Sequence, residues 1–133
     1  KDFDELMKAL KAGKNINAVI HYEKCDLYMD GEKQEKSMDA TGGMPLDDYE
    51  FFAKNAVRNE HAFVTSSQSK LIQNPIGKGY VYNYVKIRIY DNNKVEVIAR
   101  YLDPKTYEET MSEKFKGKIN DGTNNEGVFL FIE

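Results

Sequence analysis

Hydrophobic residues at the start of the chain recur with the spacing of an amphipathic helix. The positions i, i+3, i+4 and i+7 lie on one helix face and are occupied by Phe3, Leu6, Met7 and Leu10. Asp2 and Glu5 have the spacing of a capping box, and Gly13 suits the position just after the last turn. The pattern predicts a helix over residues 2–12.

After residue 15 the apolar spacing changes to two, the period of a β-strand. The first such segment places four residues on one side: Ile16, Ala18, Ile20 and Tyr22. We expect this strand to continue to Met29, turn at Asp30-Gly31 and pair with a polar strand over residues 33–40. The stretch Leu46–Val57 fits a helix and a strand, and we favour the strand.

The second half of the chain has a clearer strand pattern. Tyr80–Tyr90 and Lys94–Asp103 are both rich in Val, Ile and Tyr, and Asp91-Asn92-Asn93 lies between them. Because Asn and Asp tolerate positive φ, this order predicts a long β-hairpin. Strands are also expected over Ala62–Lys70 and Val128–Ile132. One further segment fits a strand or a helix through the spacing of Tyr107, Met111, Phe115 and Ile119.

These elements together predict an α+β protein that is mainly antiparallel β. We expect an N-terminal helix followed by a meander with local turns, which curls into a barrel or a covered sheet. With 133 residues, of which 41% are hydrophobic, the chain is long enough for one core. We therefore expect a single domain over residues 1–133, with the helix at 2–12 and a β-rich part at 15–133.

Charge and apolar runs exclude two classes of protein. The formal net charge of -3 argues against a protein that neutralises nucleic-acid phosphates, because such binding needs clustered Lys and Arg. The longest purely apolar run, Val128–Ile132, is far shorter than the roughly 20 residues of a membrane-crossing helix. We expect neither nucleic-acid binding nor a membrane span.

The sequence contains few residues suited to catalysis or metal binding. A metal site needs three or four converging ligands, whereas the chain has two histidines and one cysteine. His21 and Cys25 would stand about 13 Å apart in a continuous strand. The oxygen-rich loop Asn120–Gly127 lacks the calcium-loop pattern. We expect no catalytic residues, metal or cofactor, and the enzymatic alternative is a reactive Cys25 partnered by His61.

The strand Tyr80–Tyr90 supplies the candidate binding surface. Its alternation sends Val81, Val85 and Ile87 toward the core and leaves four candidates on the other side: Tyr80, Tyr82, Tyr84 and Arg88. Tyrosine rings beside cations are typical of surfaces that bind other molecules. The alternative is that the tyrosines only stabilise a solvent-facing sheet. The next strand adds Glu96, Ile98 and Arg100, or Val97, Ala99 and Tyr101, depending on a register that the sequence leaves open.

Six short segments follow one another along the chain: Ala12–Lys14, Val19–Cys25, Thr41–Gly43, Ala62–Thr65, the hairpin Tyr80–Leu102 and Asp103–Tyr107. Their order resembles the VirK-like family of small bacterial proteins. The resemblance implies an exported protein, periplasmic or secreted, that is associated by name with virulence, and it offers no catalytic residues. A leader removed before Lys1 would fit such export.

Two functional hypotheses follow. The first is a non-enzymatic binding or accessory protein that presents its tyrosine-rich sheet face to a protein or small-molecule partner. The alternative is a lipocalin-like carrier of a small apolar ligand, in which Val81, Val85 and Ile87 line the cavity of a β-barrel.

Overall fold

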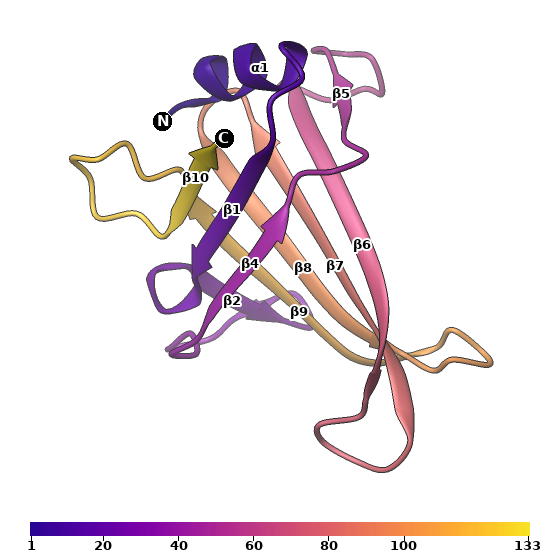
Figure 1. Ribbon diagram of the computed structural model, residues 1–133. Helices are drawn as coiled ribbons and strands as arrows, with labels where there is room; N and C mark the ends of the chain where they lie inside the picture. Colours follow the sequence, from indigo (N-terminus) through magenta and orange to yellow (C-terminus); the bar gives the residue numbers. More distant parts are fainter.

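Two antiparallel sheets face each other in the computed structural model, which describes residues 1–133, and one helix covers one end of the space between them (Figure 1). The smaller sheet has the order β10 (Val128–Ile132), β1 (Ile16–His21) and β4 (Thr41–Pro45). The larger has the order β3 (Glu32–Lys33), β2 (Asp26–Met29), β9 (Glu109–Lys118), β8 (Lys94–Leu102), β7 (Tyr80–Tyr90), β6 (Phe63–Gln73) and β5 (Glu50–Phe52). The prediction of a mainly antiparallel protein with an N-terminal helix is confirmed. The sheets do not close into a barrel, so the covered sheet is the correct form.

The helix α1 (Phe3–Lys11) begins and ends where its capping residues indicate. The Asp2 carboxylate accepts a hydrogen bond from the Glu5 backbone N–H at 2.9 Å. Glu5 pairs with the N-terminal amine of Lys1, also at 2.9 Å, so only half of the capping box forms. Gly13 follows the helix at φ +77°. The apolar stripe packs inward, and its buried members are Phe3, Leu6, Met7, Ala9 and Leu10.

The predicted continuous strand to Met29 is wrong. A 3₁₀ turn, η1 (Tyr22–Lys24), ends β1 and carries the chain from the small sheet to the large one. The Tyr22 ring packs 4.4 Å from the ring of Phe115, which favours this break. The turn at Asp30-Gly31 is confirmed with φ +53° and +80°, but its polar partner strand is only the two residues of β3.

Strand pairing is local only in part of the molecule. The strands β5 to β9 form the expected meander, whereas β1 pairs with β10 and β4, and β2 pairs with β9. The prediction that short turns join all paired strands is therefore wrong. Within Leu46–Val57 only β5 is a strand. The later segment whose spacing fitted a strand or a helix, marked by Met111 and Phe115, is the strand β9.

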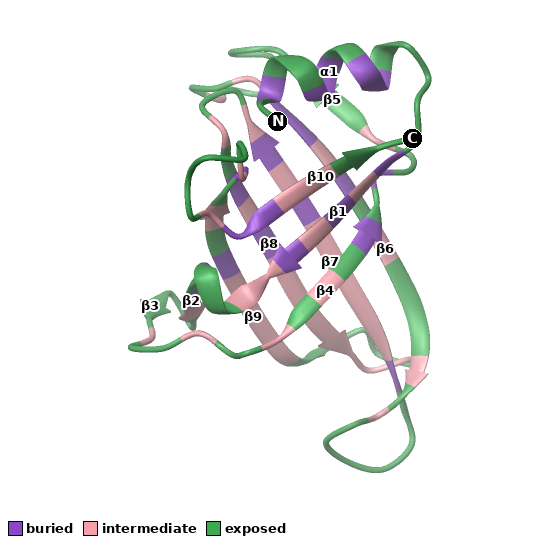
Figure 2. Ribbon diagram, turned by 60° about the vertical axis from the view of Figure 1, so that its left-hand side comes forward, coloured by how far each residue is buried: buried purple, intermediate pink, exposed green.

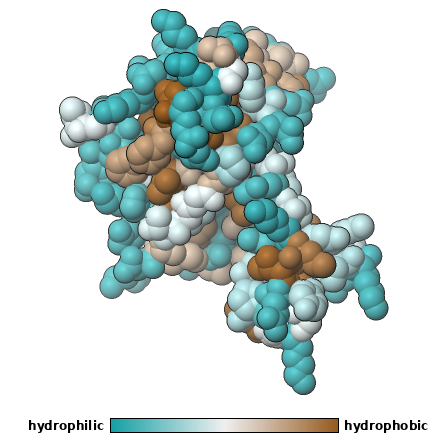
Figure 3. All heavy atoms as spheres, in the orientation of Figure 1, coloured by the Kyte–Doolittle hydropathy of each residue, from teal (hydrophilic) through white to brown (hydrophobic).

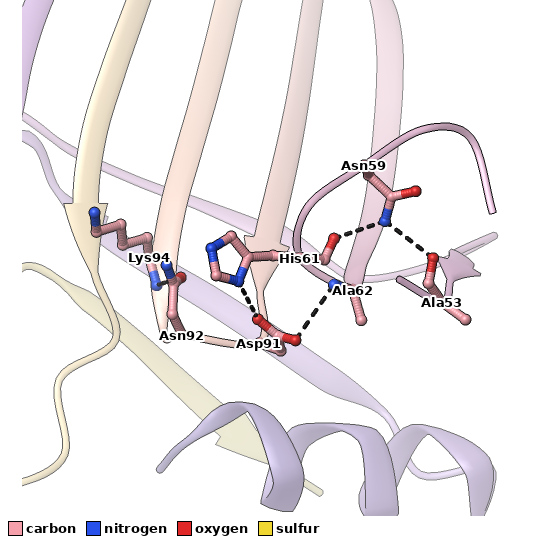
Figure 4. Close-up of polar contacts among 7 residues, drawn as sticks. All are labelled: Ala53, Asn59, His61, Ala62, Asp91, Asn92 and Lys94. Atoms are coloured by element: carbon pink, nitrogen blue, oxygen red, sulfur yellow. Dashed lines mark hydrogen bonds and ion pairs between the residues drawn. The ribbon is translucent and has the colours of Figure 1, made fainter. Parts of the chain in front are cut away.

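The end of the β7–β8 hairpin is held by a polar cluster (Figure 4). Asp91 pairs with Nδ1 of His61 at 2.9 Å and accepts the Ala62 backbone N–H at 3.3 Å. The Asn59 amide donates to the carbonyls of Ala53 and His61 at 3.0 and 2.7 Å. These bonds tie the preceding loop to the hairpin turn, so the predicted hairpin is confirmed with a fixed end.

One hydrophobic core joins the helix to both sheets, and Figure 2 shows its buried residues on the facing strands. The cover is shorter than the sheet beneath it. β6 and β7 have 11 residues each, against 6 in β1 and 5 in β4 and β10. At about 3.3 Å per residue, the β6–β7 hairpin extends well past the small sheet, as Figures 1 and 2 show.

Cys25 is buried where the two sheets meet at η1. A Cβ added at Gly117 would lie 2.8 Å from the Cys25 Sγ, and one at Gly127 would lie 3.4 Å from the same sulfur. Cys25 is therefore a packing residue whose volume is matched by two glycines.

Replacing Gly117→Ala should lower the free energy of unfolding by about 1–3 kcal/mol, because the new methyl group overlaps Cys25. Adding Cys25→Ala makes room, so the double variant should lose less than the sum of the single losses. Urea denaturation measures all three. Gly43→Ala is the control, because its Cβ meets only the Ala18 carbonyl oxygen at 3.6 Å; strictly additive losses would contradict the packing.

Candidate functional site

The outward surface of strands β7, β8 and β9 carries a dense group of cations, which we call the basic face. Residues directly opposite each other on antiparallel strands point to the same side, and the inward positions are filled by core residues such as Ile87, Val97 and Phe115. The outward side holds seven of the chain's 19 Lys and Arg residues but only two of its 22 carboxylates. These are Lys86, Arg88, Lys94, Arg100, Lys114, Lys116 and Lys118, with Glu96 and Glu109.

The observed register answers the question that the sequence left open. Arg88 lies opposite Glu96, Lys86 opposite Ile98, and Tyr84 opposite Arg100. The residues that join the tyrosines are therefore Glu96, Ile98 and Arg100. The turn at Asn93, which has φ +70°, sets this register.

Arg88 is positioned by an aromatic cluster on the same face. Its guanidinium carbon lies 4.4 Å from the centre of the Phe63 ring, and the rings of Phe52 and Tyr90 flank Phe63 at 5.1 and 5.8 Å. Phe63 is buried although it points away from the main core. Arg88 thus covers an apolar ring while its charge stays at the surface.

A charged pair occupies the middle of the basic face. The Tyr90 hydroxyl donates to Oε1 of Glu96 at 2.5 Å, and Lys114 Nζ lies 3.5 Å from Oε2. Partial burial alone would raise the pKa of Glu96, but the hydrogen bond from Tyr90 and the charges of Lys114 and Lys116 outweigh it and lower the pKa. Burial and the bond to Glu96 raise the pKa of Tyr90. Glu96 is therefore ionised, and it holds the side chains of Tyr90 and Lys114 in place.

The remaining cations of the face repel one another. Partial burial and the nearby Arg88 and Arg100 lower the pKa of Lys86. Lys94 lies directly opposite Lys118, an arrangement that disfavours the free protein. Arg100 is the exception, because its Nε lies 3.2 Å from Oε1 of Glu109. An approaching anion would relieve this repulsion.

The predicted site residues lie along one strand but do not form one compact cluster. Tyr80 is exposed near the β6–β7 loop, while the Tyr82 ring packs 6.3 Å from that of Tyr107. Arg88 lies eight residues from Tyr80, about 27 Å along the strand. Tyr84 is half-buried beside Arg100. Tyr84 and Arg88 belong to the basic face, whereas Tyr80 and Tyr82 belong to the projecting hairpin.

Sequence reasoning missed the contribution of β9 to this face. Its lysines at alternate positions, Lys114, Lys116 and Lys118, are a period-two signal that would have placed three cations on one side. Phe63 was also missed as the support of Arg88, because the two meet only through the β6–β7 pairing.

The geometry contradicts the lipocalin-like carrier. The sheets form no barrel, and Ile87 lies in the packed core while Val85 packs against its edge. The gap beside Ile87 that also touches Leu46 and Val64 has a cavity volume of about 0 Å³, far below the roughly 300 Å³ at which ligand pockets begin. A hollow of about 650 Å³ lies outside α1 and is lined mainly by charged residues, so it is no apolar cavity.

The side chains considered for metal binding and for catalysis contact other groups and not one another. The His21 ring packs 5.2 Å from Phe129, whereas the Cys25 thiol is directed at the His21 carbonyl oxygen at 3.7 Å. His61 pairs with Asp91 and not with a thiol. No group of three or more His, Cys, Asp or Glu side chains is arranged to hold a metal ion. Neither of the chain's helical segments has the length and hydrophobicity that crossing a bilayer requires.

Comparison with known proteins identifies a matching family and a solved structure with a similar fold. The model of the VirK protein family matches residues 1–107. No protein with a curated description matches the chain. The crystal structure of lpg1832, a VirK family protein from Legionella pneumophila, is similar over 98% of this chain and 95% of that one, with a TM-score of 0.71 and 19% identity. At that identity the likeness concerns the fold. The family match covers most of the chain, and the protein therefore belongs to the VirK family.

Proposed function

We propose that this protein is a small exported bacterial accessory protein that binds an acidic protein surface through the basic face and catalyses no reaction. The observation that carries the proposal is the charge segregation: seven cations and two carboxylates share the outward side of strands β7, β8 and β9 in a chain whose net charge is -3. Export rests on the resemblance to a family of exported proteins. A periplasmic or secreted location fits a partner outside the cytoplasm.

The shape of the face favours a macromolecule over a small ligand. The face is built from the outward side chains of three neighbouring strands, and small molecules bind in concave, largely apolar pockets. A hollow of about 390 Å³ at the edge of the face has no hydrophobic lining and is bordered by four lysines and two carboxylates: Lys24, Lys94, Lys116 and Lys118 with Asp26 and Glu126. The partner must therefore be a macromolecule whose surface is large enough to cover three neighbouring strands.

The composition of the face favours a protein over a nucleic acid. Arg and Tyr are enriched at the energetic centres of protein interfaces, and Tyr84, Arg88 and Arg100 supply them here. Glu96, whose carboxylate is held by Tyr90 and Lys114, would repel a phosphate backbone at the middle of the face. Ile98 adds an apolar contact next to it. An acidic protein surface with apolar groups between its carboxylates matches this pattern.

Removing two central charges tests the surface. The double variant Lys86→Gln with Arg88→Gln keeps much of both side-chain stems and should weaken binding at least about tenfold, since each lost charge contact is worth on the order of 1 kcal/mol. The probe is a fluorescein-labelled peptide of alternating Glu and Tyr, followed by anisotropy. Binding should also weaken as salt is raised.

Two controls make this result specific. Lys8→Gln with Lys14→Gln removes the same charge from exposed positions near α1 and should change affinity less than about twofold. Thermal unfolding checks that loss of the Arg88–Phe63 contact leaves the fold intact. Equal binding by both double variants, or tighter binding of single-stranded DNA of equal charge, would contradict the proposal.

The proposal that the protein is no thiol enzyme has its own test. Burial, with the charges of Asp26 and Glu126, raises the pKa of the Cys25 thiol to about 11 from 9.0. At pH 8 the thiolate fraction should then be about 100-fold smaller than in the unfolded chain, and alkylation by iodoacetamide correspondingly slower. Mass spectrometry of native and urea-unfolded protein compares the rates, and similar rates would show a reactive cysteine.

A further inference from the structure

We propose that the projecting end of the β6–β7 hairpin docks the protein on the surface of an anionic lipid bilayer. This inference goes beyond the proposed function, because it concerns the end of the hairpin and not the basic face. We call this end the hairpin tip and define it by Leu71, Ile76, Tyr80, Tyr82 and the neighbouring Tyr107 of the β8–β9 loop.

The hairpin tip exposes more apolar surface than a solvated loop needs. Ile76 is 72% exposed, Tyr107 66%, Tyr80 60% and Leu71 56%. Leu71 and Tyr107 lie beside Tyr82, because Leu71 pairs with Tyr82 and the Tyr82 ring packs 6.3 Å from that of Tyr107. Tyr80 lies on the same side of β7 as Tyr82, and Ile76 lies in the loop that joins the two strands. Figure 3 shows hydrophobic atoms gathered at this end, where the hairpin leaves the body of the protein. Such a group marks a contact surface.

The exposure of Ile76 is built into the loop. Asn74 uses its backbone N–H to bond the Gly79 carbonyl at 2.8 Å, and its side chain accepts the Ile76 N–H at 3.0 Å. Gly79 closes the turn at φ +76°, a conformation that suits glycine. The backbone is thus held by its own polar groups while the Ile76 side chain points away from any core.

The charge of the hairpin fits an anionic surface. The segment Phe63–Tyr90 contains none of the 22 Asp and Glu residues of the full chain. The same stretch has four cations, and two of them flank the tip: Lys70 and Lys78, both exposed. The acids nearby lie beside Tyr107 and are Asp103, Glu108 and Glu109. Asp103 accepts the backbone N–H groups of Lys105 and Thr106, and Glu109 pairs with Arg100 at 3.2 Å.

The combination of groups favours a bilayer over another anionic partner. Tyrosine settles at the level of lipid headgroups, lysines attract anionic lipids and an exposed isoleucine inserts beyond them. A nucleic acid would use the cations but leave Ile76 and Leu71 in water. When the hairpin tip inserts into an anionic bilayer, its apolar and tyrosine side chains contact lipid while Lys70 and Lys78 contact the headgroups.

Vesicle binding tests the docking directly. Wild-type protein should co-sediment with vesicles of phosphatidylcholine and phosphatidylglycerol at 3:1 and much less with pure phosphatidylcholine. Ile76→Ser with Leu71→Ser should lower the partition coefficient at least about tenfold through lost apolar burial. Lys70→Gln with Lys78→Gln should lower it about fivefold or more. Val57→Ser is the matched control, because Val57 is 55% exposed on another loop.

A fluorescent reporter shows which part enters the bilayer. The chain has no tryptophan, so Tyr80→Trp gives a single emitter at the hairpin tip. Its emission should shift to the blue with anionic vesicles, whereas Phe131→Trp, on the exposed side of the small sheet, should not shift.

The outcomes separate this proposal from the basic face. Lys86→Gln with Arg88→Gln should retain most of the vesicle binding while losing the acidic peptide. The docking is wrong if wild-type protein stays in the supernatant with anionic vesicles at low salt. It is equally wrong if Ile76→Ser with Leu71→Ser binds as wild type does, because the contact would then be purely electrostatic.

Discussion

The architecture depends on a mismatch in length between the two sheets. The small sheet and α1 can bury only the part of the large sheet that they reach, where Ile87, Val97 and Phe115 fill the space between the layers. Strands β6 and β7 continue beyond this cover, and their far ends must be stabilised by hairpin pairing and by their own side chains. The molecule therefore has a packed body and a projecting hairpin, and the two candidate surfaces lie on the outward side of the first and at the end of the second.

Local physical signals explain why much of the fold could be predicted. The helix follows from one apolar stripe, an Asp cap and Gly13, all within thirteen consecutive residues. The β7–β8 hairpin follows from two alternating strands and an Asp-Asn-Asn turn, so the side of Tyr80–Tyr90 that faces the core could be assigned correctly. In these elements the local sequence and the tertiary packing favour the same structure.

The errors occurred where long-range contacts override local pattern. The alternation of Ile16 to Tyr22 predicts a strand that continues, but Tyr22 reaches Phe115, some 90 residues away, and the chain turns to allow it. The pairing of β1 with β10 joins the two ends of the chain, and no local spacing encodes it. The site had the same difficulty: Phe63 supports Arg88 only because β6 lies beside β7, and the lysines of β9 meet them only through β8.

Net charge is a poor guide to the surface of this protein, because the charges are segregated. The hairpin Phe63–Tyr90 has no carboxylate, and the basic face of β7, β8 and β9 has seven cations and two carboxylates. The rest of the chain is strongly acidic, so the sum of -3 describes neither part. Maintaining this separation has a free-energy cost, because Lys94 lies directly opposite Lys118 and like charges at such positions disfavour the folded chain. Folding alone gives no reason to place these cations together. A sheet face that repels itself in the free protein is stabilised when an anionic surface covers it, so the strain lies where we propose that binding occurs.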